Sequence, residues 1–479
     1  MPKLTIETIN PKVVEAKYAV RGAVPIRAGE IKKDMQIHPE KYPFDSLIMS
    51  NIGNPHALMQ KPLSFHREVL SLVSSPFLLE KEEILKGHFS PESIKRAKDF
   101  MASIPVGTGA YTNSKGFEFV RKHVAEYIEE RDGFPANPEN IYLTDGASAG
   151  VKNILQLIAS PGDGVMIPIP QYPLYSATLS LLGAKQIDYF LDEDDCWGIK
   201  KEELLRSYAA ADTTIRALCV INPGNPVGAV LVKKDIEDII SFCHEKGILL
   251  MADEVYQINC YKEEKPFISF KKTLCEMERD GRIPKGEVEL VSFHSVSKGI
   301  IGECGLRGGY MEVVNIDEEV LAQVYKMASV SLCPNTTGQL VVDLMIHPPT
   351  EPETRAIYDK EVSELFMSLK RRAKKVGESL TGVEGIHLNP VEGAMYAFPR
   401  IDIPEKAVAE AKKRGVAPDV MYCLDMLEEV GVCTVPGSGF GQRPGTFHVR
   451  FSFLPLEEVF DSFMDRVIGF HKKFLAKWK

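Results

Sequence analysis

The middle of the chain alternates short β-rich runs with helical segments, and this alternation limits the possible fold more than any other feature. Strands that alternate with helices imply a mostly parallel sheet with right-handed crossovers. We therefore expect an α/β fold with its ligand at the carboxyl ends of the strands, as in other open α/β sheets. The β-rich runs occupy residues 141–144, 165–168, 186–190, 216–222, 248–253, 289–294 and 309–314.

Sequence of a different kind lies on both sides of this region. The first hundred residues are irregular, with short helical stretches at 64–73 and 90–100. A Pro-rich segment at 347–354 precedes a charged helical segment at about 355–378, and a strand-like run follows at 448–454. Because a cleft between two domains is a common ligand site, we expect one between a large α/β domain and a smaller α+β domain. The expected limits are 1–75 for an N-terminal segment with part of the small domain, 76–346 for the large domain and 347–479 for the rest of the small domain.

Composition excludes several classes of protein. The 57 Lys and Arg against 66 Asp and Glu give a net charge of −9, which disfavours nucleic acid as a partner. No apolar run approaches the roughly 18–20 residues of a membrane-spanning helix, so no membrane partner is expected. The nine cysteines form no CxxC pair and no zinc-ligand spacing, so we expect reduced thiols and no metal. The first thirty residues lack a long apolar stretch and lack Ser, and acids interrupt them, so we expect a cytoplasmic protein.

The run LTDGASAGVKNILQLI, at 143–158, places small residues between a strand and a helix. Gly146, Ala147 and Ser148 would present backbone N–H groups and one hydroxyl at the amino end of that helix. Such an end binds anions, most naturally phosphate. Taken alone, this run is better explained by a helix capped by Ser with small residues for packing.

Two further segments follow strands in the same way. LLMADEVYQ, at 249–257, places two acids after an apolar strand, and metal binding would explain them if the chain also carried GxxxxGK[ST], which it lacks. SFHSVSKGIIGECGLRGGY, at 292–310, places Lys298 just after a strand, among small neutral residues. Most lysines are solvated surface charges, but an amine removed from water is a nucleophile for carbonyl groups.

A phosphate-binding turn, an acid at a strand end, a Tyr and a Lys at a strand end are together the parts of a pyridoxal phosphate site. Their order resembles that of the fold-type I, class I aminotransferases. Long strings are most similar to the alanine aminotransferase group, and the similarity runs from about residue 18 to the C-terminal end. These strings lie at 51–57, 167–179, 217–228, 252–257, 292–315, 392–400 and 435–455.

The resemblance implies a role for each matching residue. Lys298 would bond covalently to pyridoxal phosphate and then move the proton of the substrate Cα. Asp253 would pair with the pyridinium nitrogen, while Tyr256 and Asn225 would bind the phenolic oxygen. Val227 replaces the Thr that is more usual beside Asn225, which is a conservative change. Ala147, Ser148, Ser295 and Arg307 would bind the phosphate, and Tyr172 would stack on the ring.

The same resemblance implies a substrate site and a dimer. Arg450 would bind the substrate α-carboxylate, with Asn225 and Gly53 beside it. Tyr111 resembles a residue that reaches the phosphate of a neighbouring subunit, which implies a homodimer with a shared active site.

The activity implied by the resemblance is interconversion of L-alanine and 2-oxoglutarate with pyruvate and L-glutamate by a ping-pong mechanism. A glutamate:glyoxylate aminotransferase is an alternative, because pocket differences worth only about 1–3 kcal/mol set such preferences. A pyridoxal phosphate-dependent lyase is a further alternative. A regulatory module is disfavoured, because no basic helix-turn-helix segment is visible and both Lys298 and Arg450 are present.

Overall fold

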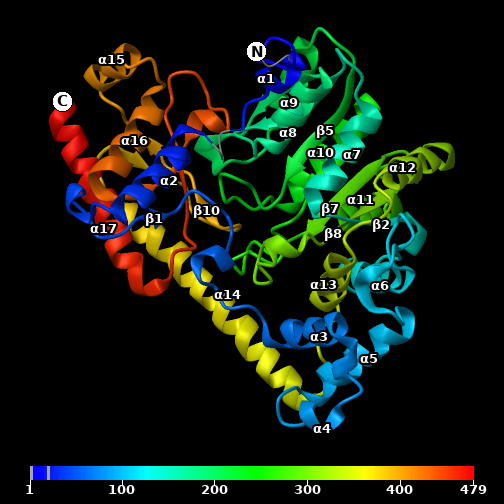
Figure 1. Cartoon of the computed structure of the whole chain (residues 1–479). Helices are drawn as coiled ribbons and strands as arrows, with labels where there is room; N and C mark the ends of the chain where they lie inside the picture. The colour runs from blue at the N-terminus through cyan, green and yellow to red at the C-terminus, as the bar shows by residue number, and fades with distance from the viewer. Residues whose placement is uncertain (1–3, 19–21) are drawn as a thin grey trace.

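A seven-stranded sheet forms the centre of the larger part of the molecule in the computed structural model, which describes residues 4–18 and 22–479 (Figure 1). The strand order is β2-β8-β7-β6-β5-β3-β4, and β8 is antiparallel to both of its neighbours, whereas the other pairs are parallel. This confirms the mostly parallel α/β sheet expected from the sequence. The strands are β2 (Ile141–Thr144), β3 (Gly164–Ile169), β4 (Lys185–Phe190), β5 (Ile215–Ile221), β6 (Leu249–Asp253), β7 (Leu290–Ser295) and β8 (Gly309–Val314).

Helices cover both faces of this sheet, because its central strands are apolar on both sides. Along β6, Leu250 and Ala252 pack into one buried cluster, while Leu249 and Met251 pack into another, as the two-residue period of a strand requires. The first cluster is completed by α9 (Lys201–Ala210), α10 (Lys233–Lys246) and α11 (Phe270–Arg279). The second is completed by α7 (Ala147–Ile158), α8 (Leu174–Leu182) and α12 (Glu318–Val330).

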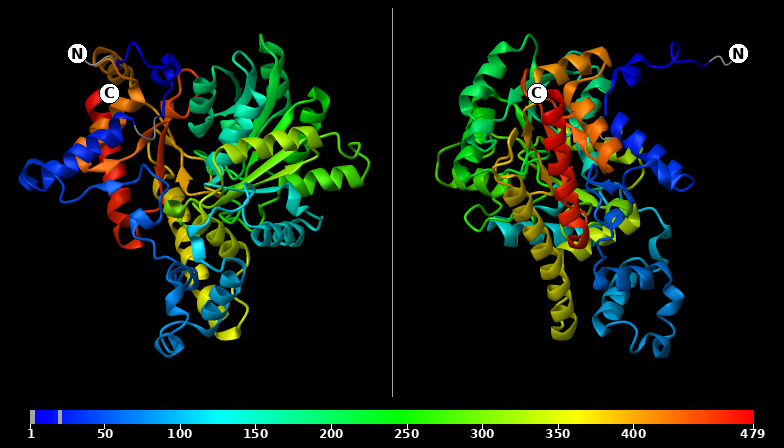
Figure 2. Two further views of the ribbon diagram at one scale, coloured as in Figure 1. Left: turned by 45° about the vertical axis from the view of Figure 1, so that its right-hand side comes forward. Right: turned by 90° about the vertical axis from the view of Figure 1, so that its left-hand side faces the viewer.

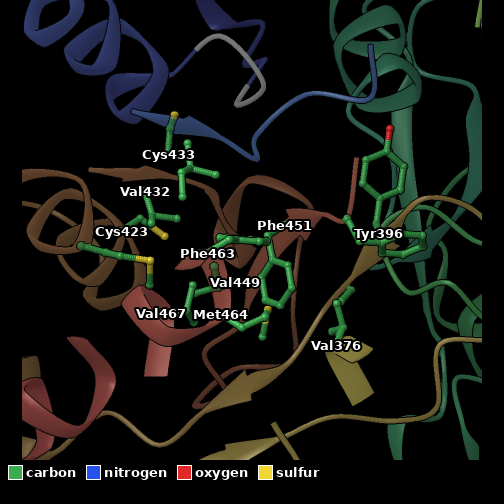
Figure 3. Close-up of a cluster of buried hydrophobic side chains, with 14 of the residues drawn as sticks. Val376, Tyr396, Cys423, Val432, Cys433, Val449, Phe451, Phe463, Met464 and Val467 are labelled. Carbon is green, nitrogen blue, oxygen red and sulfur yellow. The ribbon is translucent and has the colours of Figure 1, made fainter. Parts of the chain in front are cut away.

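The smaller part is built from both ends of the chain, as the blue, yellow, orange and red ribbon at one side of Figure 1 shows. Strands β10 (Tyr396–Ala397), β14 (Val449–Ser452) and β13 (Val435–Pro436) form an antiparallel sheet. The parallel pair of β1 (Ile48–Met49) and β12 (Val432–Cys433) ties the N-terminal segment to the C-terminal one. Figure 3 shows part of the apolar core between these strands and α17 (Glu457–Trp478).

Helices enclose this core and extend away from it. They are α2 (Ala23–Met35), α14 (Pro352–Leu380), α15 (Glu405–Lys413), α16 (Pro418–Val430) and α17 (Glu457–Trp478). The yellow helix α14 leaves the small part and reaches the helices drawn in blue, as both views of Figure 2 show. The short strands β9 (Ile386–His387) and β11 (Arg400–Ile401) pair with each other, while the short helix α1 (Pro11–Glu15) lies against α8 of the large part.

A third group of helices packs beside the sheet, around a buried cluster that runs from Leu63 to Tyr358 in sequence. The group consists of α3 (Ser64–Ser74), α4 (Glu82–Leu85), α5 (Pro91–Ser103), α6 (Glu118–Asp132) and α13 (Thr336–Ile346). The domain limits expected from the sequence stay a prediction. Among residues 4–18 and 22–479, no helix is both long enough and apolar enough to cross a bilayer.

Candidate active site

A cavity of about 260 Å³ lies at the carboxyl edge of the sheet, between the large and the small part of the molecule. Every site residue expected from the sequence lines this cavity, with the exception of Tyr111. The expected residues that line it are Gly53, Ala147, Ser148, Tyr172, Asn225, Asp253, Tyr256, Ser295, Lys298, Arg307 and Arg450.

The direction of the strands explains why these residues meet. Asp253 is the last residue of β6 and Ser295 is the last residue of β7, so both lie at the same edge of the sheet. Lys298 follows β7 after two residues. Because β8 is antiparallel, its start and not its end lies at this edge, and Arg307 lies two residues before that start.

The amino end of α7 and Arg307 form a site suited to an anion. Gly146 precedes α7 with a φ of 74°, and Ala147 and Ser148 are the first residues of the helix. The Arg307 guanidinium donates from Nη2 to the carbonyl oxygen of Asp145 at 2.8 Å. A Cβ at Gly146 would lie 2.5 Å from Nη2 of Arg307, so only glycine lets the arginine approach the helix end. A helix end and a guanidinium that converge in this way favour phosphate binding.

Asp253 is a buried carboxylate at the base of the cavity. Burial raises its pKa to about 6, although a hydrogen bond from Tyr175 opposes that rise. The Tyr175 hydroxyl donates to Oδ2 of Asp253 at 2.9 Å. The sequence analysis missed Tyr175, which stands three residues after Tyr172, so helical spacing was the available signal. A protonated ring nitrogen beside Asp253 would supply the positive charge that the buried carboxylate lacks.

Asn225, Tyr256 and Arg450 form one hydrogen-bonded chain along the cavity. Nη1 of Arg450 donates to Oδ1 of Asn225 at 3.1 Å, and Nδ2 of Asn225 donates to the Tyr256 hydroxyl at 3.5 Å. The second terminal nitrogen of Arg450 donates to the carbonyl oxygen of Asn51 at 2.6 Å. Arg450 therefore has a fixed orientation before any ligand binds.

The Lys298 amine donates to the carbonyl oxygen of Gly53 at 3.0 Å. Tyr396 and Cys304 also line the cavity near Lys298, and the sequence analysis did not place Tyr396 there. Tyr396 belongs to the string EGAMYAFPR, but nothing in that string shows which way its hydroxyl points. Tyr18 lies at the cavity as well, and its hydroxyl is 2.7 Å from that of Tyr172.

Tyr111 does not reach the cavity within one chain. It follows a short 3₁₀ turn at Gly107–Gly109 and leaves 78% of its surface exposed. Its expected role at a neighbouring subunit stays a prediction.

Within the described ranges, one group of side chains has the spacing of metal ligands, although the sequence indicated no metal. His123, Asp343 and His347 lie together where α6 meets α13, away from the cavity. Nδ1 of His123 lies 2.6 Å from Oδ1 of Asp343, and the Arg96 guanidinium lies 3.8 Å from Oδ2. The negative charge of Asp343 is thus already balanced in part by the Arg96 guanidinium.

The arrangement of strand-end acid, strand-end lysine and anion site agrees with a comparison to known families. The family model described as "Aminotransferase class I and II" matches residues 82–466. The chain belongs to this family. Class I and II aminotransferases depend on pyridoxal phosphate, so the cofactor expected from the sequence is confirmed at the level of the family.

Relatives of this aminotransferase cover almost the whole chain. The "Probable alanine aminotransferase, mitochondrial" of Dictyostelium discoideum is 48% identical, over 99% of this chain and 90% of the relative. The "Glutamate--glyoxylate aminotransferase 2" of Arabidopsis thaliana is 45% identical, over 99% of this chain and 97% of the relative. The solved alanine aminotransferase of Pyrococcus furiosus has a TM-score of 0.75 and 25% identity, over 97% of this chain and 100% of that one.

The cytoplasmic location expected from the N-terminal composition is wrong by this comparison. The Dictyostelium relative and two alanine aminotransferases of Arabidopsis thaliana, 46% and 45% identical to this chain, are named mitochondrial. The expectation failed because acids and missing serines are only compositional signals.

The residues of the cavity fit pyridoxal phosphate. The anion site at α7, the buried carboxylate of Asp253 and the amine of Lys298 occupy one cavity. The Tyr256 hydroxyl and the Asn225 amide lie along the same wall and can donate hydrogen bonds to an oxygen atom. Each polar group of the cofactor therefore has a partner of the right chemical type in the chain.

Proposed function

We propose that this aminotransferase interconverts L-alanine and 2-oxoglutarate with pyruvate and L-glutamate. In one half-reaction the amino group of alanine passes to the enzyme and pyruvate leaves. In the other half-reaction the enzyme gives that amino group to 2-oxoglutarate, and glutamate leaves. The names of relatives at 46–48% identity over nearly the whole chain support alanine as the amino donor.

The observation that carries the proposal is the state of Arg450. Its side chain is 1% exposed, and no carboxylate within residues 4–18 and 22–479 forms an ion pair with it. A buried cation without an anionic partner is costly, and a bound carboxylate offsets that cost. Because Arg450 shares its cavity with Lys298, a substrate α-carboxylate on Arg450 would bring the Cα of that substrate toward the lysine amine.

Lys298 would remove the proton from the substrate Cα and return a proton during the same half-reaction. Its amine lies at the cavity wall, beside the carbonyl oxygen of Gly53, and so has an acceptor that holds it in place. Pyridoxal phosphate, when bound, supplies an electron sink for the charge that develops at Cα.

The other residues would hold the cofactor and set its charge. Asp253 would keep a proton on the ring nitrogen, because a buried carboxylate favours a cation beside it. Tyr256 and Asn225 would donate to the phenolic oxygen. Tyr172 would cover one face of the ring. Arg307, Ala147, Ser148 and Ser295 would bind the phosphate.

A homodimer with a shared site forms part of the proposal. Tyr111 is exposed and lies outside the cavity of its own chain, so a role at a phosphate requires a second subunit. We expect the phosphate site of each subunit to be completed by Tyr111 from its partner.

Glutamate:glyoxylate aminotransferase is a second candidate, because two relatives with that name are 45% identical to the chain. A half-reaction screen separates the two functions. The enzyme loaded with pyridoxal phosphate is mixed with single amino acids, the change in cofactor absorbance is followed, and the aminated enzyme is then mixed with single oxo acids.

We expect alanine and glutamate to aminate the enzyme, and pyruvate and 2-oxoglutarate to reverse the change. A much faster reversal by glyoxylate than by pyruvate would overturn the alanine assignment. Lys298→Ala, which removes the amine but leaves the phosphate site, is the control and should show no turnover with any pair.

A further inference from the structure

Tyr396 lies between Lys298 and Arg450, the two residues on which the proposed reaction depends. It is the first residue of β10, and it lies at the edge of the apolar core of the small part. Figure 3 shows its hydroxyl directed away from the other labelled side chains of that core. The ring is therefore held by packing, while the hydroxyl faces the cavity that also contains Lys298 and Arg450.

The ring of Tyr396 supports Arg450. The guanidinium carbon of Arg450 lies 4.3 Å from the centroid of this ring and 4.6 Å from the centroid of Phe440. An aromatic face within about 6 Å attracts a cation, and the attraction grows when water is excluded. The position of the Arg450 guanidinium thus depends on the Tyr396 ring.

The hydroxyl of Tyr396 lies close to the Lys298 amine, and Gly53 makes this possible. A Cβ built on Gly53 would lie 1.9 Å from the Tyr396 hydroxyl and 3.3 Å from Nζ of Lys298. The hydroxyl and the amine therefore border the same small volume. Any residue other than glycine at position 53 would push the tyrosine hydroxyl out of it.

The electrostatic surroundings agree with this geometry. Burial raises the pKa of Tyr396, but Lys298, Arg450 and a hydrogen bond from Tyr256 outweigh burial and hold that pKa below its usual value. The Tyr256 hydroxyl donates to the Tyr396 oxygen at 3.3 Å, so the Tyr396 oxygen is an acceptor with one lone pair still available.

We propose that Tyr396 is a positioning residue for the reaction. Its ring holds Arg450 in place, and its oxygen accepts a hydrogen bond from the Lys298 nitrogen, which favours the protonated state of that nitrogen. Gly53 is then required by the Tyr396 hydroxyl. This gives Gly53 a second role besides its expected place beside the substrate. The inference rests on the proposed role of Lys298 but does not depend on which amino acid is the substrate.

Two substitutions separate the roles of the ring and the oxygen. Tyr396→Phe keeps the ring, so KM for the amino acid should stay within about twofold while kcat falls about 5- to 30-fold, the range for one lost hydrogen bond. Tyr396→Leu also removes the aromatic face, so KM should rise as well. The proposal would be overturned if Tyr396→Phe and Tyr396→Leu changed kcat and KM in the same way.

A titration that needs no substrate provides the decisive measurement. Cofactor absorbance, which reports protonation at the Lys298 nitrogen, is followed against pH for the holoenzyme and each variant. Because an acceptor favours the protonated form, its loss in Tyr396→Phe should move the titration to lower pH by about half a unit to one unit. An unchanged titration midpoint would overturn the proposal.

Gly53→Ala should shift the midpoint in the same direction as Tyr396→Phe, because it displaces the same hydroxyl. The matched control is Tyr261→Phe, which removes a buried hydroxyl that donates to the carbonyl oxygen of Ala394 in the same core, outside the cavity lining. Tyr261→Phe should lower stability and leave the midpoint unchanged. If the parent enzyme were inactive with every amino acid but Tyr396→Phe still shifted its midpoint, the proposed function would fail and this inference would stand.

Discussion

Arg450 combines deep burial with incomplete hydrogen bonding. Its two terminal nitrogens donate to Asn225 and Asn51, while Nε has no partner in the described part of the chain. A planar guanidinium can bind a carboxylate through two parallel hydrogen bonds, and a lysine ammonium cannot. The geometry of this single residue therefore leads to a prediction about both proposed substrates.

Arg450→Lys should lower kcat/KM for alanine and for glutamate together, because each carries an α-carboxylate. Losing one arm of a charged hydrogen-bonded pair, worth roughly 1.5–3 kcal/mol, corresponds to about 10- to 150-fold. Single-turnover kinetics with each amino acid would measure the effect. Cofactor occupancy should not change, since the proposed phosphate site lies elsewhere in the cavity.

The control for this variant is Arg372→Lys. Arg372 is also buried, but it donates to the carbonyl oxygens of Leu454 and Pro455 and lies outside the cavity lining. Its substitution should affect stability and leave kcat/KM unchanged. A steep loss for glutamate alone in Arg450→Lys would mean that Arg450 binds the side-chain carboxylate of glutamate and not the α-carboxylate.

At the level of elements, α13 sets the position of the loop that carries Arg307. Gly338 lies in the first turns of this helix, and a Cβ there would lie 2.6 Å from the carbonyl oxygens of Leu306 and Arg307. The backbone of the loop thus rests directly on the helix. No flexible side chain lies between them that could move aside.

Gly338→Ala should therefore weaken pyridoxal phosphate binding by about tenfold or more, because displacing Arg307 would remove its proposed charged hydrogen bond to the phosphate. Elsewhere in a helix, replacing Gly by Ala usually gains up to about 1 kcal/mol of folding stability. Gly377→Ala in α14, where nothing lies within 4 Å, is the matched control. It should stabilise the protein and leave the cofactor dissociation constant, measured by fluorescence titration, unchanged. Equal cofactor affinity in both variants would contradict the prediction.

A second link between elements joins α3 to α13 through a buried histidine. Nε2 of His66 lies 3.1 Å from the carbonyl oxygen of Leu344, and burial lowers the pKa of His66 to about 4. The unfolded chain binds a proton at this histidine below about pH 6.5, whereas the folded chain stays neutral until about pH 4. Stability must then fall as the pH falls from 6.5 toward 4.

His66→Gln should remove this dependence, because the amide can donate to Leu344 without titrating. Between pH 7 and pH 5 the parent should lose about 2 kcal/mol of unfolding free energy relative to the variant. Urea unfolding of both holoenzymes at several pH values would test this. If the unfolding free energies of parent and variant changed equally with pH, His66 would not be the source of this dependence.

The sequence predicted the secondary-structure elements better than any other part of the structure. The seven β-rich runs coincide with β2 to β8 within one or two residues, since alternation and apolar character are local properties. The site residues at strand ends followed from the same local pattern together with the resemblance. Tyr396 could not be placed, because its approach to Gly53, Lys298 and Arg450 depends on contacts between segments far apart in sequence. The αL conformation of Arg307, with a φ of 54°, was also not predictable, since non-glycine residues rarely adopt it and no local sequence signal marks it.

For the whole molecule, the exposed position of Tyr111 has a measurable consequence for assembly. Lys298→Ala and Tyr111→Ala should each be inactive or weak as homodimers. In a mixed dimer, one site would combine Lys298 of the Tyr111 variant with Tyr111 of the lysine variant. Refolding an equal mixture should restore about a quarter of parental activity, because half of the dimers are mixed and each has one intact site of two.

The control for the mixing experiment is each variant refolded alone under the same conditions. Activity that stays at the level of the two separate variants would show that Tyr111 does not serve a partner's site. Size-exclusion chromatography of the parent would show independently whether a dimer forms.

The pairing of β1 with β12 has a consequence for the order in which the molecule can be made. The hydroxyl of Ser50, just after β1, donates to the carbonyl oxygen of Ser452, 402 residues further along the chain. At about 5–20 residues per second on the ribosome, the N-terminal segment waits roughly 20–80 s for these partners. The sheet that carries Asp253 and Lys298 is translated in full during that interval, before Arg450 exists. The residues proposed to hold the cofactor are therefore synthesised before the arginine proposed to bind the substrate.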